Sequence, residues 1–358
     1  MTRQPRGGRR HLLMMLTTLP AAMRAGRPLA AASPSPATVP FAETPRLFVA
    51  GPADGALNHW ADALLPALEQ SLPPDTAIKR VEIGSADGVT GANQFEVRGA
   101  PDGQTVLLAP GRAPLAWLVG DPRAKFDVAH WVPVIAGSSP AVVVGRPTVL
   151  TPNGRARVAA AAPASLDLTA LLGIYLLRTN MEPVFGLWEP GTVESAFAQG
   201  VVDALLVRGH RVPERVAALT AAGAQPLFTL GALDEHRRLV RDPVFPALPH
   251  FSELFAISTG NQPSGPLYEA WCAAAAAAQL DFGLVLPQLT PAAMVALWRR
   301  AGSDAVAEVG VQATAATASV RPLAGLVATA NTAALAASAP ALLELRRWLA
   351  SRFHWRPA

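Results

Sequence analysis

The sequence predicts an α/β protein with mostly parallel sheets. Short apolar runs of strand length alternate along the chain with segments whose apolar residues recur at helical spacing. The segments between them are rich in Gly, Pro and Asp, which is typical of turns. Alternating strands and helices favour a mostly parallel sheet in each half. The 358 residues are enough for two domains, and 51% apolar with 16% charged residues is typical of a globular chain.

The clearest unit is the stretch 47–68. Residues 47–49 are an apolar run that predicts a buried strand, and 51–55 predict a turn. The apolar residues from Leu57 to Leu68 then lie on one stripe at helical spacing. The free N–H groups and the positive dipole end at the start of such a helix favour an anion. An ordinary strand-to-helix connection explains the same pattern, so both interpretations stay open.

The remaining elements follow in order. Pro101, Asp102 and Gly103 predict a tight turn, because Pro presets φ, Asp bonds the backbone and Gly accepts a positive φ. Further strands are predicted at 78–83, at 106–108, twice within 131–144, up to Leu206, and at 223–230, with a proline-rich extended segment at 243–251. Helices are predicted at 92–98, 162–177, 193–197, 270–278, 291–309 and 341–352.

The first 32 residues predict an export signal. Arg9 and Arg10 precede a short apolar stretch at 11–22, and small residues follow up to Ala32, near which we expect cleavage. The paired arginines resemble a twin-arginine signal, although Gly8 stands where Ser or Thr is usual. About a dozen apolar residues are too few to span a bilayer, which needs ~20. A membrane anchor or a disordered tail is the alternative. Residues 33–44 are a proline-rich linker.

The charge distribution argues against a nucleic-acid partner. The formal charge is +4, but residues 1–32 hold six of the 30 basic residues and none of the acidic ones. Without them, 24 basic residues face 26 acidic ones, a charge of −2. The basic character therefore belongs mostly to the leader, so it does not predict a nucleic-acid partner.

No pattern of a catalytic or metal site is found. Cys272 is the single cysteine, so no internal disulfide forms, and its alanine-rich neighbourhood indicates a core residue. The seven histidines lack metal-ligand spacing, and no nucleophile elbow or phosphate-binding glycine loop is present. We therefore expect no enzyme, no metal and no cofactor. An exported hydrolase stays open as an alternative only if a base distant in the sequence lies next to Ser165 in the fold.

Several ordered motifs give the chain a resemblance to a known family. They are Pro52-Ala53 with Gly55, Pro101-Asp102-Gly103-x-Thr105, Trp131-Val132-Pro133-Val134, Gly200-x-Val202-Asp203, Leu248-Pro249-His250-Phe251, and Phe282-Gly283-Leu284-Val285-Leu286-Pro287 with Thr290-Pro291. In this order and spacing, over residues 45–310, the chain resembles the Bug proteins, the periplasmic solute receptors of tripartite tricarboxylate transporters.

The resemblance implies a type II periplasmic-binding-protein fold, with two α/β lobes and two crossings between them. Lobe 1 would comprise 45–142 and 252–358, and lobe 2 would comprise 143–251. The cleft would hold a small organic acid mainly through backbone N–H groups, and the protein would be a periplasmic monomer that delivers it to an inner-membrane transporter or sensor. By position, the ligand loops would fall on 52–58, 109–113 and 163–165.

The loops also depart from the family pattern. Asp54-Gly55-Ala56-Leu57-Asn58 replaces the usual glycine run followed by Asp, and Arg112 stands where small hydroxyl residues are usual. Arg112 is either a carboxylate clamp or a solvated charge, and Asn58 is either a ligand contact or a helix cap. Trp188 and Glu189 border the expected second-lobe contact region. The predicted ligand-binding residues are Gly55, Ala56, Leu57, Asn58, Pro110, Gly111, Arg112, Ser138, Ser139 and Ser165.

Two functions from different classes follow. The first is a solute-binding protein for a small carboxylate. The second is a degenerate relative that has lost the site and acts as a structural or sensory partner. Residues 252–281, an apparent insertion relative to the family, have no assigned role.

Overall fold

The structure is a computed structural model that describes residues 41–151 and 154–355. The predicted signal and the linker before residue 41 lie outside the described residues. Val39–Ala358 forms one compact unit that contains two main sheets. We call each sheet with its covering helices a lobe.

Lobe 1 is built on a six-stranded sheet with strands from both ends of the chain. Its members are β1 (Arg46–Val49), β2 (Lys79–Glu82), β3 (Thr105–Ala109), β4 (Val132–Ser138), β12 (Leu280–Leu286) and β13 (Arg321–Ala324). Their order is β13-β4-β12-β3-β1-β2. β1 is parallel to β2 and β3, whereas β12 is antiparallel to β3 and β4, and β13 is antiparallel to β4.

Lobe 2 is built on a five-stranded sheet. Its members are β5 (Ala141–Gly145), β6 (Arg155–Ala159), β7 (Asn180–Val184), β8 (Ala204–Arg208) and β9 (Gln225–Thr229). Their order is β7-β6-β8-β5-β9, with β6 parallel to β7 and β8, and β5 antiparallel to β8 and β9. A hairpin of β10 (Ala232–Leu233) and β11 (Leu239–Val240) follows.

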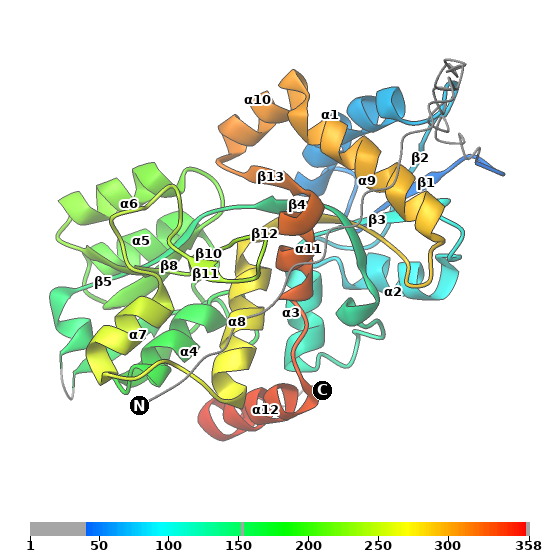
Figure 1. Ribbon diagram of the computed structural model, residues 1–358. Coiled ribbons are helices and arrows are strands. Elements are labelled where there is room, and N and C mark those ends of the chain that lie inside the picture. Colours follow the sequence, from blue (N-terminus) through cyan, green and yellow to red (C-terminus); the bar gives the residue numbers. More distant parts are fainter. Residues whose placement is uncertain (1–40, 152–153, 356–358) are drawn as a thin grey trace, which may run out of the picture. The chain divides into compact units, whose positions relative to one another are not determined.

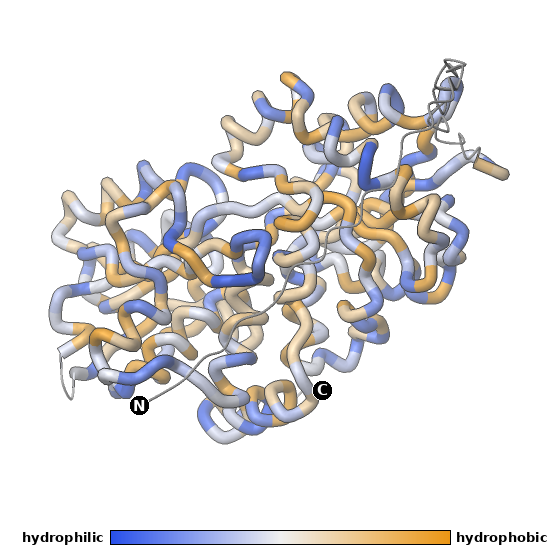
Figure 2. The backbone as a smooth tube through the Cα atoms, viewed as in Figure 1, coloured by the Kyte–Doolittle hydropathy of each residue, from blue (hydrophilic) through white to orange (hydrophobic). Residues whose placement is uncertain are grey.

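Helices cover the sheets, and hydrophilic and hydrophobic residues alternate along the outer ones (Figure 2). The helices are α1 (Ala56–Ser71), α2 (Val89–Arg98), α3 (Arg112–Val119), α4 (Leu168–Leu176), α5 (Pro190–Ala198), α6 (Val212–Ala221), α7 (Phe251–Thr259), α8 (Pro266–Gln279), α9 (Ala292–Ala307), α10 (Val309–Ala318), α11 (Gly325–Ala333) and α12 (Ala339–Phe353). The described residues contain no helix long and apolar enough to cross a membrane.

The chain crosses between the lobes twice, as expected. β4 of the first sheet continues into β5 of the second, and the chain returns through α7 and α8 into β12 (Figure 1). Because β12 enters on the return crossing and fits between β3 and β4, it runs against both. The predicted pair of α/β lobes is confirmed, but both sheets are mixed rather than mostly parallel.

The core has three parts. One apolar cluster joins α1 and α9 to the six-stranded sheet, and another joins α5 and α6 to the five-stranded sheet. The third and largest contains residues of both sheets and of α3, α4, α8 and α12. Trp271 of α8 is fully buried in it and donates its indole N–H to the Thr169 carbonyl of α4 at 3.0 Å. Helix α8, in the second half of the segment 252–281, is therefore a central part of the core.

The predicted elements are found, with shifted ends. The helix expected at 162–177 begins only at Leu168, because residues 161–167 form a turn held by the Asp167 side chain. The helix expected at 291–309 is divided into α9 and α10 near Glu308, which has an extended backbone. The prediction of an extended segment at 243–251 is wrong, because residues 243–248 form turns. The boundaries proposed for the two lobes stay a prediction.

Candidate functional site

A cavity of about 790 Å³ lies between the lobes. Lobe 1 contributes Asp87, the start of α3, and the turn with Asp121 and Arg123. Lobe 2 contributes residues after the carboxyl ends of three neighbouring strands, β6, β7 and β8. Ligands of α/β proteins bind at such strand ends, so the topology places this cavity where a ligand site is expected.

Two of the predicted ligand residues, Arg112 and Ser165, line this cavity. Trp188 and Glu189, expected to border the ligand, line it too. The eight others lie elsewhere: Gly55, Ala56, Leu57, Asn58, Pro110, Gly111, Ser138 and Ser139.

The first predicted loop is a self-contained turn. The amide of Gly55 donates to the Pro52 carbonyl at 2.9 Å, and the amide of Asn58 donates to the Gly55 carbonyl at 3.0 Å. Asn58 is buried, and its Nδ2 also donates to the Pro52 carbonyl, at 2.7 Å. The Asn58 side chain thus holds the turn before α1.

The second predicted loop is packed against the return crossing. Gly111 donates its amide to the Leu280 carbonyl at 3.1 Å, and Ser139 donates its amide to the Gln279 carbonyl at 2.8 Å. Ser138 and Ser139 are buried at the junction of β4 and β5. These residues therefore join the lobes and do not face the cavity.

The third loop contacts the cavity, but its amides are also engaged. The amide of Ala161 donates to Oδ2 of Asp167 at 3.0 Å, and the amide of Ser165 donates to the Ala162 carbonyl at 3.2 Å. The Ser165 hydroxyl lies 2.9 Å from both the Asp167 carboxylate and the Ala162 carbonyl. The amides of Gly55, Asn58, Gly111, Ser139, Ala161 and Ser165 are therefore already used within the protein.

Charged side chains are the main polar groups of the cavity. Its lining includes four arginines and four carboxylates, and their formal charges cancel. What decides the chemistry is which of them already have partners. The eight are Arg112, Arg123, Arg208, Arg215, Asp87, Asp121, Asp167 and Glu189.

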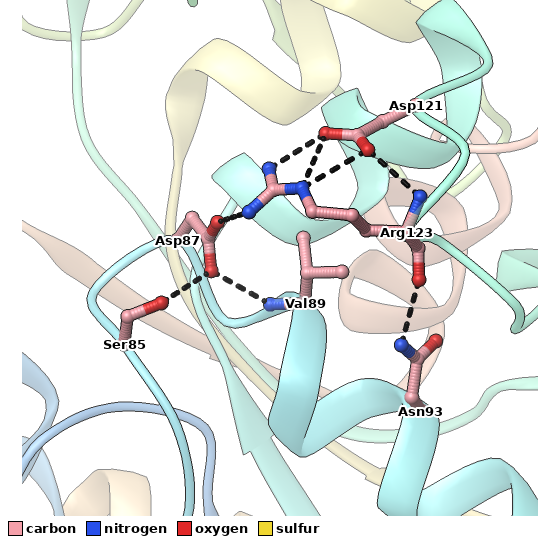
Figure 3. Close-up of polar contacts among 6 residues, drawn as sticks. All are labelled: Ser85, Asp87, Val89, Asn93, Asp121 and Arg123. Atoms are coloured by element: carbon pink, nitrogen blue, oxygen red, sulfur yellow. Dashed lines mark hydrogen bonds and ion pairs between the residues drawn. The ribbon is translucent and has the colours of Figure 1, made fainter. Parts of the chain in front are cut away.

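Arg123 is fully committed within lobe 1. Its guanidinium lies 2.6 Å from the Asp121 carboxylate and 2.9 Å from the Asp87 carboxylate, so that it bridges the two (Figure 3). These bonds hold the pKa of Asp121 below its ordinary value, chiefly through the side-chain hydrogen bond from Arg123. Asp87 in turn accepts the Val89 amide at 3.1 Å, at the start of α2. The cluster therefore fixes the cavity edge and leaves Arg123 no capacity to bind a ligand anion, since two carboxylates share its one positive charge.

Arg215 is committed within lobe 2. Its Nε lies 2.6 Å from the Glu194 carboxylate, and its Nη1 donates to the Arg208 carbonyl at 2.8 Å. Arg215 therefore supports the backbone at the end of β8, where the Arg208 side chain begins.

Arg208 and Arg112 differ from the other two arginines. Within residues 41–151 and 154–355, neither guanidinium forms an ion pair or a side-chain hydrogen bond. Burial lowers the pKa of Arg208 below its ordinary value; the Asp167 and Asp281 charges oppose this shift, and the Arg112 and Arg215 charges add to it. Both residues line the same cavity, although Arg112 belongs to lobe 1 and Arg208 to lobe 2.

Sequence reasoning did not find Arg208. The available signal was its position, directly after the apolar run Ala204–Val207 and before Gly209, where a strand ends. A charged residue at the carboxyl end of a buried strand is placed to meet a ligand. The signal is weak, because many strands end in a charged residue.

Asp281 is a second desolvated group, located at the start of β12. Its Oδ2 accepts the indole N–H of Trp60 at 2.6 Å, and burial raises the pKa of the carboxyl above its ordinary value. The other described residues yield no cluster of three or more His, Cys, Asp or Glu side chains that suits a metal. Burial also raises the pKa of the Cys272 thiol to about 11, so this thiol is protonated at neutral pH.

The raised pKa of Asp281 predicts a pH-dependent stability. Because its folded-state pKa lies above the unfolded value of 3.8, its contribution is fully present below that value and is lost as the pH rises through the folded pKa. Asp281→Asn keeps an oxygen for Trp60 without a charge. We expect it to be about 1 kcal/mol more stable than the natural protein at pH 7 and no more stable near pH 4. Urea unfolding at both pH values measures this.

The fold is similar to that of a TctC solute binding protein from Polaromonas, crystallised with no ligand. The sequences are 16% identical, the match covers 84% of this chain and 97% of that one, and the TM-score is 0.62. MatC from Rhodopseudomonas palustris, with bound malate, is 19% identical over 86% of this chain and 98% of its own, with a TM-score of 0.47. No protein-family model matches the sequence, and neither does any curated protein. The resemblance inferred from the sequence is thus confirmed at the level of the fold.

Proposed function

We propose that this chain, which has the fold of a TctC solute binding protein, is an exported receptor for a small carboxylate. The single observation that carries this proposal is the pair Arg112 and Arg208, two guanidinium groups without partners among the described residues that line one cavity from different lobes. The leader at residues 1–32, if it is cleaved near Ala32, sends the protein to the periplasm.

The energetics favour an anion between these groups. A desolvated cation without a partner is costly, and the neighbouring Arg112 charge adds repulsion. A carboxylate accepts two parallel N–H bonds from a guanidinium, and such charge-assisted bonds are about twice as strong as neutral ones. A bound carboxylate therefore offsets both the desolvation of Arg208 and its repulsion from Arg112.

The position of the pair also provides a means of signalling. A ligand that contacts both arginines joins the two lobes, so its binding favours the arrangement in which they are close. A membrane transporter or sensor that recognises this arrangement would accept only the loaded receptor. In this proposal the acid links the lobes through the two arginine side chains and not through backbone amides.

Arg112→Ala tests the proposal directly. We expect it to weaken binding of the carboxylate ligand by about 1 to 3 kcal/mol, because one charge-assisted contact is lost while the fold is kept. The ligand is first found by thermal shift across dicarboxylates, tricarboxylates, amino acids and aromatic acids. A true ligand at a hundredfold excess over Kd stabilises the protein by about 2.7 kcal/mol. Calorimetric titration with that ligand then gives the affinities of the natural protein and of Arg112→Ala.

The matched control is Arg300→Ala, an exposed arginine of α9 that does not line the cavity. It removes the same charge from the protein and should leave the affinity unchanged. If no acid in the panel stabilises the natural protein, the receptor function is rejected and the degenerate relative is the better description.

A further inference from the structure

More than half of the residues that line the cavity are apolar. Six alanines from both lobes line it, together with four leucines. Small side chains on several neighbouring segments leave a broad, smooth wall, which offers apolar contact and few hydrogen bonds. The alanines are Ala116, Ala159, Ala160, Ala161, Ala162 and Ala164.

Trp188 adds a large aromatic surface to this wall. It lies in the loop between β7 and α5 and lines the cavity, and 68% of its surface is exposed. The described part of the chain contains no other exposed tryptophan. An exposed indole beside an apolar cavity offers an apolar surface on which a ligand can pack.

The loop that carries Trp188 is held in place. Gly186 donates its amide to the Ala161 carbonyl at 3.1 Å, and Leu187 donates its amide to the Ala160 carbonyl at 3.4 Å. Gly186 has φ of 89°, which favours glycine at this bend. After the loop, Val193 donates its amide to the Glu189 carbonyl at 3.0 Å as α5 begins. The indole therefore stands on a fixed backbone next to the alanine wall.

The charges of the cavity limit the charge of the ligand. The formal charges of its lining cancel, and Arg123 and Arg215 are already paired. Arg112 and Arg208 remain, with the Asp167 carboxylate near enough to act on Arg208. Glu189 also lines the cavity, and the Asp281 charge acts on Arg208 as well. The lining therefore has no surplus of positive charge, so the second and third carboxylates of a tricarboxylate would lack a cation.

We infer that the ligand is an aromatic monocarboxylate, whose carboxylate binds Arg112 and Arg208 while its ring packs on Trp188 and the alanine wall. The inference rests on the proposed function and adds the class of ligand to it. A cavity of about 790 Å³ has room for a ring, whereas a short-chain acid would leave most of the apolar wall uncovered.

Calorimetric titration of the full chain tests this with benzoate, 4-hydroxybenzoate, hexanoate, succinate and citrate. We expect the two aryl acids to bind at least tenfold more tightly than the other three. Trp188→Ala should weaken the aryl acids at least tenfold, which corresponds to about 1.4 kcal/mol. Trp188→Phe, which keeps a ring, should retain their affinity within about threefold.

Phe185→Ala is the matched control. Phe185 belongs to the same loop but packs on Phe353, with ring centroids 5.5 Å apart, and does not line the cavity. It should leave the affinity for benzoate unchanged. Tighter binding of succinate, citrate or hexanoate than of benzoate overturns the aromatic class and leaves the carboxylate receptor standing. If Trp188→Ala binds benzoate as tightly as the natural protein does, the aromatic class is likewise overturned and the carboxylate receptor stands. If none of the five acids binds but another acid of the wider thermal-shift panel does, the aromatic class alone is rejected; if no acid of that panel binds, both proposals are rejected.

Discussion

Arg208→Gln is expected to weaken ligand binding about 30-fold or more, or about 2 kcal/mol, and at the same time to stabilise the ligand-free protein by about 1 kcal/mol. The two effects have one cause. Burial of the Arg208 guanidinium, which has no ion-pair partner among the described residues, costs folding free energy, and the ligand restores it. Glutamine keeps the length and polarity of the side chain without the charge.

Two measurements check this result: calorimetric titration with the ligand, and urea unfolding without it. Arg155→Gln is the control, because Arg155 starts β6 in the same lobe, pairs with Glu182 on the surface and does not line the cavity. An exposed pair of this kind contributes less than about 1 kcal/mol, and its loss should not change binding. A destabilised ligand-free Arg208→Gln would mean that Arg208 supports the fold, which would contradict its assignment as a ligand contact.

Gly111→Ala is expected to destabilise the protein by about 3 kcal/mol or more. A Cβ at this position would lie 2.0 Å from the Ala277 carbonyl oxygen and 2.6 Å from the Leu280 carbonyl oxygen. Both contacts are with backbone atoms, so no side chain can rotate away, and α3 must move from the end of α8. The backbone angles of Gly111 are ordinary, with φ of −63°, so close packing and not conformation requires glycine here.

Gly310→Ala is the matched control, because a Cβ at Gly310 in α10 meets nothing within 4 Å. Alanine there should be neutral or stabilising by up to about 1 kcal/mol, since it favours the helix more than glycine does. Urea unfolding of both variants gives the comparison. If Gly111→Ala were as stable as Gly310→Ala, the backbone contact between α3 and α8 would have to move at little cost in free energy, which would contradict the prediction.

The comparison of Gly111 with Arg208 shows what the sequence can and cannot predict. Periodicity identifies residues that face a core, so the stripe from Leu57 to Leu68 and the strand at 106–108 were found correctly. Gly111 was interpreted as part of a ligand loop, but its glycine serves a contact with Ala277, 166 positions later. Arg208 was missed, because its role depends on Arg112 reaching the same cavity from another lobe.

The same limit applies to the strand directions. The sequence analysis used 282–287 only as a family motif, and local patterns do not reveal that β12 returns from the second lobe and fits between β3 and β4 in the opposite direction. Pairing partners distant in the chain decide this, and the alternation of strands and helices is equally compatible with a parallel neighbour. The contacts of Ser138 and Ser139 have the same origin: Ser139 donates its amide to the Gln279 carbonyl, and Ser138 pairs with Leu280, both on that return crossing.

Helix α8 packs on α3 of lobe 1 and on α4 of lobe 2, and Trp271 bonds to α4 from its centre (Figure 1). A rigid rod shared by two moving halves permits only small sliding displacements of helix against helix, because interdigitated side chains resist wide separation. The amplitude of closure around a ligand would therefore be limited by α8, whose end contacts Gly111, the residue before Arg112. Substitutions along this rod should alter the rates of capture and release while leaving the selectivity among solutes intact.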